Sequence, residues 1–200
     1  MATTQRRTTT APAPQRRADA ERNIAAILHA ALRALSADPA ASVADIAKAA
    51  GVGRVTLYGH FPSRESLVDA VFAHAMSQAE ATLAAEPLDD LPAGEALTRL
   101  VASSWEVLDR HRRLLVAADR ALSTERIREW HDQPLARVER LIARGRDEGA
   151  FRTDLPVSWL VSTFFSLLHT AAQEIESGRL DRADAAGVLS ATLLGAFRAA

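Results

Sequence analysis

The stretch from Ser42 to Phe61, SVADIAKAAGVGRVTLYGHF, constrains the fold more than any other part of this chain. Ser42 is a favourable N-cap for a short helix over 43–50, in which the apolar residues recur at helical spacing. Gly51 follows at the position where a left-handed residue turns the chain away from the helix axis. Gly53 then starts a second short helix. Two short helices joined by a tight glycine turn indicate a helix-turn-helix.

Polar side chains that can bind DNA are concentrated in the second of these helices. It contains Arg54, Thr56, Tyr58 and His60, and Lys48 lies on the helix before it. Such side chains donate hydrogen bonds to phosphates and base edges when a recognition helix enters a major groove. The alternative is a helical hairpin inside a larger bundle, with its polar residues solvated. The spacing alone does not decide between the two, because helix-turn-helix patterns often arise by chance.

The run IAKAAGVGRVTLYGHFPSRESL resembles the signature of the TetR family of transcriptional regulators, which is approximately I-A-x-x-A-G-V-S-x-G-T-L-Y-x-H-F-x-S-K-x-x-L. The positions that fall in register are Ile46, Ala47, Ala50, Gly51, Val52, Thr56, Leu57, Tyr58, His60, Phe61, Ser63, Arg64 and Leu67. A match this dense is much more specific than a lone glycine motif. The chain departs from the signature at Gly53, Val55 and Gly59, and Gly59 removes one side chain that could contact DNA.

The resemblance implies an all-α protein with an N-terminal three-helix helix-turn-helix domain and a C-terminal helical domain for ligand binding and dimerisation. It also implies a homodimeric repressor that a small-molecule effector releases from a palindromic double-stranded DNA operator. The residues expected to lie at the DNA are Ser42, Lys48, Gly53, Arg54, Val55, Thr56, Tyr58, Gly59 and His60. Of these, Arg54 and Thr56 are expected at bases or the adjacent phosphates, and the other polar side chains at the backbone.

The composition agrees with an all-α class, because Ala and Leu dominate and β-branched residues are sparse. The absence of cysteine excludes disulfides and thiol chemistry. No apolar run approaches the roughly 18 residues that span a bilayer. Neither Arg6–Arg7 nor Arg16–Arg17 precedes a hydrophobic stretch, so we expect no signal peptide, no membrane partner and a cytoplasmic location.

The net charge of −1 conceals an asymmetry along the chain. Residues 1–78 contain nine Lys and Arg against six Asp and Glu, whereas residues 79–200 contain fifteen against nineteen. The positive part coincides with the helix-turn-helix, as a DNA-facing domain requires.

The pattern divides the chain into a tail and two domains. Residues 1–18 lack periodic apolar residues and are expected to be a disordered basic tail, either a plain flexible tail or an arm that contacts DNA. Residues 19–62 are expected to form the DNA-binding domain and residues 63–200 the effector-binding and dimerisation domain. A helix over 63–85 should link the two.

The C-terminal part has helical patterns that vary in clarity. We expect a helix over about 94–110, a break, and a shorter helix over 111–122. Residues 123–148 are helical in pattern, but Pro134 predicts a kink or a restart, because proline inside a helix costs about 3 kcal/mol.

The last two helices are expected to form the homodimer interface. The helix over 156–176 is apolar nearly all round, and the helix over 181–199 has small residues at four-residue steps. These small residues are Gly187, Ala191, Gly195 and Ala199. Burial against a second subunit is favoured over burial inside one chain, because so small a protein has little interior to cover such a helix.

Motifs of common enzyme classes are absent. The chain has no phosphate-binding glycine loop, no Gly-x-Ser-x-Gly elbow and no Glu-x-x-His pair, so we expect no catalysis, no cofactor and no metal. The residues selected as possible lining of an effector pocket are Trp105, Trp130, His131, Phe164, Phe165, His169 and Gln173. Their aromatic and weakly polar character favours an uncharged or mildly polar effector. Two alternatives remain: a helical small-molecule-binding protein that has weakened or lost DNA binding, and an enzyme in the C-terminal bundle.

Overall fold

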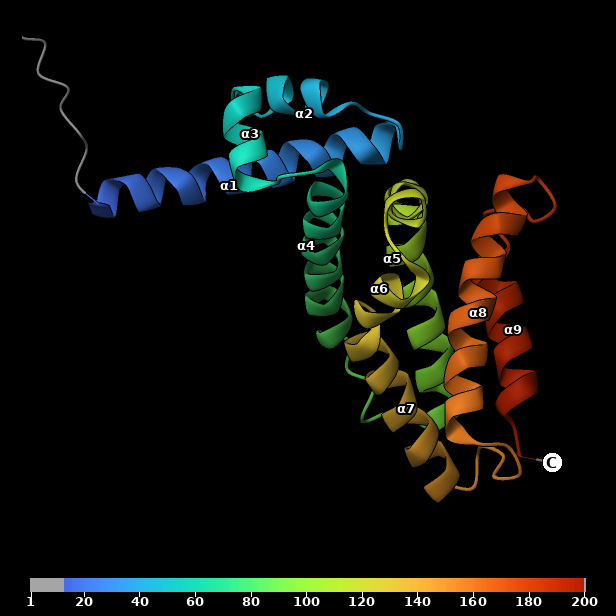
Figure 1. Cartoon of the computed structure of the whole chain (residues 1–200). Coiled ribbons are helices and arrows are strands. Elements are labelled where there is room, and N and C mark those ends of the chain that lie inside the picture. The colour runs from blue at the N-terminus through green and yellow to red at the C-terminus, as the bar shows by residue number, and fades with distance from the viewer. Residues whose placement is uncertain (1–12, 200) are drawn as a thin grey trace, which may run out of the picture.

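The computed structural model describes residues 13–199, and these residues fold into nine α-helices (Figure 1), which confirms the all-α class. The helices are α1 (Ala13–Ala37), α2 (Val43–Ala49), α3 (Arg54–His60), α4 (Arg64–Ala84), α5 (Ala93–Ala121), α6 (Thr124–Glu129), α7 (Asp132–Asp147), α8 (Val157–Glu176) and α9 (Ala185–Phe197). No helix within residues 13–199 is both long enough and apolar enough to cross a membrane.

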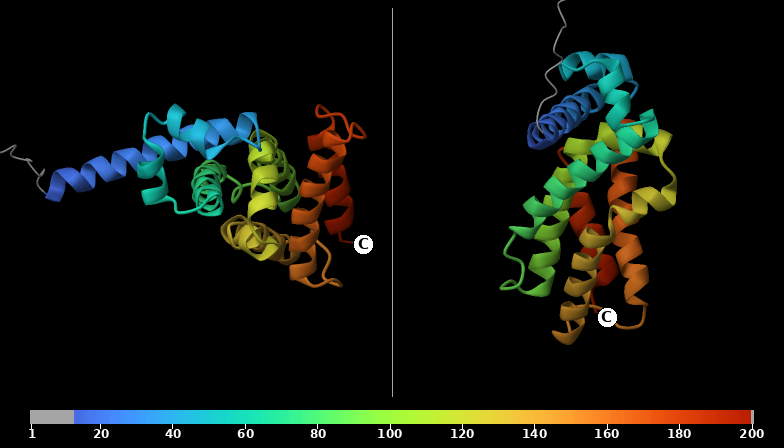
Figure 2. Two further views of the ribbon diagram at one scale, coloured as in Figure 1. Left: turned by 45° about the horizontal axis from the view of Figure 1, so that its top comes forward. Right: turned by 60° about the vertical axis from the view of Figure 1, so that its left-hand side comes forward.

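The helices pack around two hydrophobic cores. The first lies among α1, α2, α3 and the first half of α4, and the second among α5, α7, α8 and α9. Figure 2 shows the first group as a head above the bundle, with α4 descending from it. The last turns of α5 also enter the first core through Leu114, Ala117 and Ala118. Helix α5 therefore belongs to both packing units.

Local signals determine the α2–α3 hairpin as the sequence predicted. The Ser42 hydroxyl accepts a hydrogen bond from the Asp45 amide at the start of α2, and Gly51 has a φ of 70°. This positive φ is the left-handed conformation that glycine adopts without steric cost. Ala47 and Leu57 are both buried in the first core, so the two short helices cross over small and apolar side chains.

Helix α4 begins with a capping box, because the Ser63 hydroxyl accepts from the Ser66 amide and the Ser66 hydroxyl accepts from the Ser63 amide. Its buried side chains change surroundings along its length. Leu67 and Val71 pack in the first core, whereas Leu83 lies at the other end, beside the C-terminal bundle. This single rigid element therefore runs from the helix-turn-helix to the bundle.

The predicted break near residues 110–111 is wrong, since α5 runs without interruption from Ala93 to Ala121. No glycine or proline stands at the expected break. Instead, Arg110 pairs with Glu106 at 2.8 Å and Arg112 pairs with Asp109 at 3.6 Å, so i,i+4 and i,i+3 ion pairs span it.

Helix α1 starts at Ala13, earlier than the predicted start at Asp19. Arg17 pairs with Glu21, and Asp19 pairs with Arg22, so polar pairs along the surface support turns that lack apolar periodicity. These N-terminal turns project from the body on the side away from α8 and α9 (Figures 1 and 2). The predicted disordered tail over residues 1–18 is therefore wrong for residues 13–18, which are helical, and its residues 1–12 lie outside the described residues.

The predicted restart around Pro134 is confirmed. Helix α6 ends at Glu129 and α7 begins at Asp132, so Pro134 lies in the first turn of α7, where a missing amide donor costs little. Further along α7, Gly145 lies against the ring of Phe151, and a Cβ at this glycine would collide with that ring. Glycine is thus required there for the turn after α7 to fold back onto the helix.

Helices α8 and α9 pack against the bundle on one side and expose apolar residues on the other. Trp159 of α8 is 62% exposed and Val188 of α9 is 47% exposed. Helix α9 is shorter than predicted, because residues 181–184 form a turn before its start at Ala185.

Candidate nucleic-acid interface and internal pocket

Helix α3 is held in the protein by a single buried side chain. Leu57 is fully buried, whereas Val55 is 88% exposed and Tyr58 is 47% exposed. Arg54 and Thr56 are exposed as well. A helix that presents nearly all of its side chains to solvent is suited to insertion into a groove that is wider than one helix, such as the DNA major groove.

The other residues predicted to contact DNA lie around α3. Ser42, Lys48, Gly53 and Gly59 are exposed, and His60 is half-buried. The Ser42 hydroxyl is already occupied, because it donates to an Asp45 carboxylate oxygen at 2.6 Å while it caps α2. At Gly59 no atom lies within 4 Å of the place where a Cβ would stand, so this part of α3 exposes its backbone.

Arg64 positions the helix-turn-helix, a role that sequence reasoning missed. It sits at the start of α4 and donates hydrogen bonds to the carbonyl oxygens of Pro39, at 2.9 Å, and Ala41. Both acceptors belong to the connection between α1 and α2. The guanidinium therefore fixes the position of α2 relative to α4, and nothing in the local sequence pattern indicates these distant partners.

An internal pocket lies between α4, α5, α7 and α8. The cavity volume is about 100 Å³. A bulky ligand must therefore displace side chains. The lining residues are Phe72, Ala75, Met76, Ala79, Leu83, Leu100, Ser104, Val107, Leu108, His111, Leu115, His131, Pro134, Leu135, Arg137, Val138, Phe164, Phe165, Leu168 and His169. No carboxylate is among these described residues.

Three histidines, together with Ser104 and Arg137, give the pocket its polar character. Burial lowers the pKa of His111 and of His131, and burial together with His131 lowers the pKa of His169 to about 4. All three are therefore neutral near pH 7. His131 Nδ1 lies 2.7 Å from the Ile127 carbonyl oxygen, which can only accept, so Nδ1 carries the proton and Nε2 is left as an acceptor.

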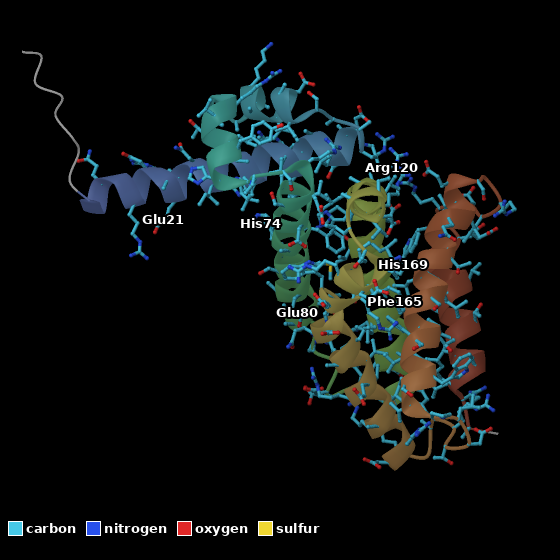
Figure 3. The ribbon with its side chains drawn as sticks, viewed as in Figure 1. Glu21, His74, Glu80, Arg120, Phe165 and His169 are labelled. Carbon is cyan, nitrogen blue, oxygen red and sulfur yellow. The ribbon has the colours of Figure 1, made fainter. Side chains whose placement is uncertain are left out.

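The structure brings four of the seven predicted pocket residues together. His131, Phe165 and His169 contact one another, with ring centroids 5.0 Å apart for His131 and Phe165 and 4.2 Å apart for Phe165 and His169. Figure 3 labels Phe165 and His169. Phe164 lines the same pocket.

The other three predicted pocket residues lie outside it. Trp105 is buried in the second core, Gln173 is exposed on α8, and Trp130 packs against α4. Size and polarity select residues that need burial or partners, but they do not specify which of several apolar faces surrounds a cavity.

A polar cluster, formed by Asp69, Arg126 and Trp130, connects the pocket region to α4. Two Arg126 nitrogens each lie 2.9 Å from an Asp69 carboxylate oxygen, and the Trp130 indole N–H donates to Asp69 at 2.9 Å. The Arg126 guanidinium lies 4.5 Å from the centre of the Trp130 ring. Hydrogen bonds from Arg126 lower the pKa of Asp69. Since His131 directly follows Trp130, this cluster joins the pocket wall to the helix that carries the helix-turn-helix.

Comparison with known proteins found a family match, a related repressor and similar solved structures. Residues 27–71 match the family described as bacterial regulatory proteins, tetR family. The chain is 28% identical over 162 residues to the HTH-type transcriptional repressor LfrR of Mycolicibacterium smegmatis. The aligned residues cover 79% of this chain and 82% of LfrR.

Solved structures share the fold. The crystal structure of LfrR from Mycobacterium smegmatis in complex with proflavine has a TM-score of 0.65 at 24% identity and covers 86% of this chain and 94% of that one. The structure of FadR from Bacillus halodurans, a fatty acid degradation regulator, has a TM-score of 0.71 at 22% identity, covering 87% and 99%. FadR from Bacillus subtilis in complex with stearoyl-CoA has a TM-score of 0.69 at 19% identity, covering 86% and 95%.

Proposed function

Because this chain belongs to the TetR family of bacterial transcriptional regulators, we propose that it is a homodimeric repressor that a small molecule releases from a palindromic operator. The observation that supports this most strongly is the combination of an exposed recognition helix with a separate apolar pocket, joined by α4 and α5. One site would bind DNA and the other would control it.

The DNA-binding part of the proposal rests on α3. Arg54 and Thr56 would contact bases or neighbouring phosphates, and Tyr58, His60 and Lys48 would contact the backbone. In a symmetric dimer, two copies of α3 would enter successive major grooves about 34–36 Å apart.

The dimerisation part of the proposal rests on the outer faces of α8 and α9, which correspond to the predicted interface segments 156–176 and 181–199. The exposed positions Gly187 and Gly195 have no other atom within 4 Å of a built Cβ, so packing inside the chain does not explain these glycines. Glycine lets two helices approach closely, and Trp159 supplies a large apolar surface beside them. A symmetry-related copy would cover both.

The effector-binding part of the proposal rests on the chemistry of the internal pocket. Over the described part of the chain, the lining is mostly apolar, its histidines are neutral, it has no carboxylate, and its one arginine, Arg137, donates a hydrogen bond to the Glu86 carbonyl oxygen at 3.1 Å. Such a lining favours a mostly apolar ligand that carries a hydrogen-bonding group. His111 Nδ1 is buried without a hydrogen-bond partner among the described residues, and His131 Nε2 is an acceptor. LfrR and FadR, which share this fold, have been seen with proflavine and stearoyl-CoA, respectively, so the architecture can accommodate small molecules.

The contact between Asp69 and the Arg126–Trp130 segment offers a route from pocket to DNA. A ligand that moves His131 or Pro134 would displace α6, and the ion pair would transmit the displacement to α4. Because α4 follows the helix-turn-helix directly, its tilt sets the spacing of the two recognition helices. The effector would shift the population toward a spacing that does not fit the operator.

The test is selection of bound sequences from a random duplex pool at a stated salt concentration, because affinity for phosphates depends on salt. Enrichment of a palindrome is the expected result. A pool that never enriches would contradict DNA recognition and favour the alternative of a small-molecule-binding protein that has lost it.

A further inference from the structure

A second cleft lies at the junction of the helix-turn-helix and α5, on the outer surface. It is lined by Pro39, Ala40, Ser42, Val43, Ala44, Arg54, Tyr58, Arg64, Glu65, Ala117, Arg120 and Ala121. Three arginines from three different helices thus meet in one cleft: Arg54 from α3, Arg64 from α4 and Arg120 from α5. Figure 3 shows Arg120 at the end of α5 that lies beside the head.

The charges in this cleft are mostly unbalanced. Within the described residues, the guanidinium groups of Arg54 and Arg120 have no hydrogen-bond or ion-pair partner, and both side chains are exposed. Glu65 is the one carboxylate among the residues that line the cleft. Three positive charges against one negative charge make a site for an anion.

The end of α5 is fixed relative to α2 and α3, so Arg120 is not a loosely placed surface charge. Leu114, Ala117 and Ala118 are buried in the core of the head. Arg113, seven residues before Arg120 and therefore on the same helix face, donates a hydrogen bond to the Ala37 carbonyl oxygen at the end of α1. Both sides of the cleft therefore belong to one packed unit.

We propose that this cleft binds a phosphate group of the operator backbone, and that Arg120 brings a DNA contact from the C-terminal domain. The proposal rests on the proposed DNA-binding function. Guanidinium groups pair with phosphate oxygens through parallel hydrogen bonds, which suits them to this ligand. DNA is favoured over a free phosphate because Arg54 and Tyr58 belong both to the cleft and to the exposed surface of α3.

This contact would also connect the two sites through one helix. Upstream of Arg120, α5 supplies His111 and Leu115 to the wall of the internal pocket. A ligand that shifts α5 would therefore move a phosphate-binding side chain directly, in addition to any change in α4. Effector release of DNA would have a second, shorter route.

The test compares Arg120→Gln with the wild type on the palindrome recovered from the duplex pool. Loss of one phosphate contact per protomer should weaken binding roughly tenfold on both the palindrome and a scrambled duplex, and lower the slope of log K against log salt by about 2 per dimer. Arg99→Gln is the matched control, since Arg99 is exposed on the same helix at its other end. Melting curves of both variants should match the wild type, because neither side chain is buried.

The outcomes separate this proposal from the proposed function. Wild-type binding to a palindrome together with an unchanged affinity and salt slope for Arg120→Gln would overturn the cleft assignment alone. Failure of the wild type to enrich any duplex would overturn the function itself. A variant that binds DNA normally but loses thermal stabilisation by inorganic phosphate would assign the cleft to free phosphate, and would also overturn the DNA contact.

Discussion

The recognition helix and the internal pocket differ in almost every physical respect. Helix α3 is seven residues long, exposed and polar, and it is attached through one leucine. The pocket is built by residues between Phe72 and His169 on four helices, and it is apolar with neutral histidines. The first site presents polar and charged side chains at the exposed surface, whereas the second is lined mainly by apolar side chains.

Because α3 and the internal pocket use different residues, one site can influence the other without competition for side chains. The residues that line the internal pocket do not overlap with those that line the cleft beside α3, but α4 and α5 each contribute residues to both. Long helices transmit displacement because their backbone hydrogen bonds make them stiff. In the proposed mechanism, a change in pocket packing would therefore reach α3 as a change of position and not as a change of chemistry.

The largest predicted effect comes from truncation of the one buried side chain that attaches α3 to the core. Leu57→Ala should lower the free energy of unfolding by about 2–5 kcal/mol, because the side chain is fully buried. DNA binding should be lost with it. Denaturant unfolding and binding to the selected duplex measure the two effects. Val55→Ala, at an exposed position in the first turn of the same helix, should leave the free energy of unfolding unchanged.

The second prediction concerns charge without packing. Arg54→Ala should weaken binding to the selected palindrome by about 1–3 kcal/mol and relax its base preference, while the melting temperature stays constant. Competition between the palindrome and point-substituted duplexes measures both quantities. Arg140→Ala, an exposed arginine on α7, serves as control. Equal loss of affinity in both variants would mean that α3 does not read the groove.

The third prediction tests the connection between the regions. Asp69→Asn removes the acceptor charge for Arg126, so α6 should open more often and its amides over 124–129 should exchange with solvent about tenfold faster, as expected of a weakened local unit. Hydrogen exchange measures this without knowledge of the effector. Glu129→Gln removes the other carboxylate paired with Arg126, which is exposed, and should change the exchange much less. Equal effects would contradict the assigned connection.

The smallest predicted effect is a pH dependence of the pocket. The pKa of His169 is lowered to about 4 in the folded protein, so its contribution is fully present above the unfolded value near 6.5 and is lost as pH falls toward 4. His169→Gln should flatten the decline in melting temperature over this window. Gln173→Ala, one turn further along α8 and exposed, should retain the wild-type decline. A decline of the same steepness in the His169 variant would show that burial of this ring is not its cause.

The two sites also differ in how far the sequence could predict them. The α2–α3 hairpin depends on signals between residues a few positions apart, such as the Ser42 cap and the left-handed Gly51, and these were predicted correctly. The pocket depends on which faces of distant helices meet. Large or weakly polar side chains near apolar stripes were the basis for selecting Phe164 and His169, which do line the pocket. The same reasoning selected Trp105 and Trp130, whose side chains pack elsewhere.

Long-range polar contacts were the features that could not be predicted. Arg64 bonds to carbonyls on the α1–α2 connection, and Arg126 bonds to Asp69 on another helix, yet neither pair shares a local motif. The false break in α5 has the opposite origin. The sequence predicts a break before residue 111, although ion pairs on the surface maintain the helix through it.

A hydroxyl-radical footprint of the protein on its selected duplex tests whether two α3 helices bind DNA together. A homodimer with one α3 in each major groove should protect two half-sites related by symmetry, with centres about 34–36 Å apart on one face of the DNA. Both patches should weaken together in Arg54→Ala. A single protected patch, or uniform protection with no repeat, would contradict a dimer that places two α3 helices in successive major grooves.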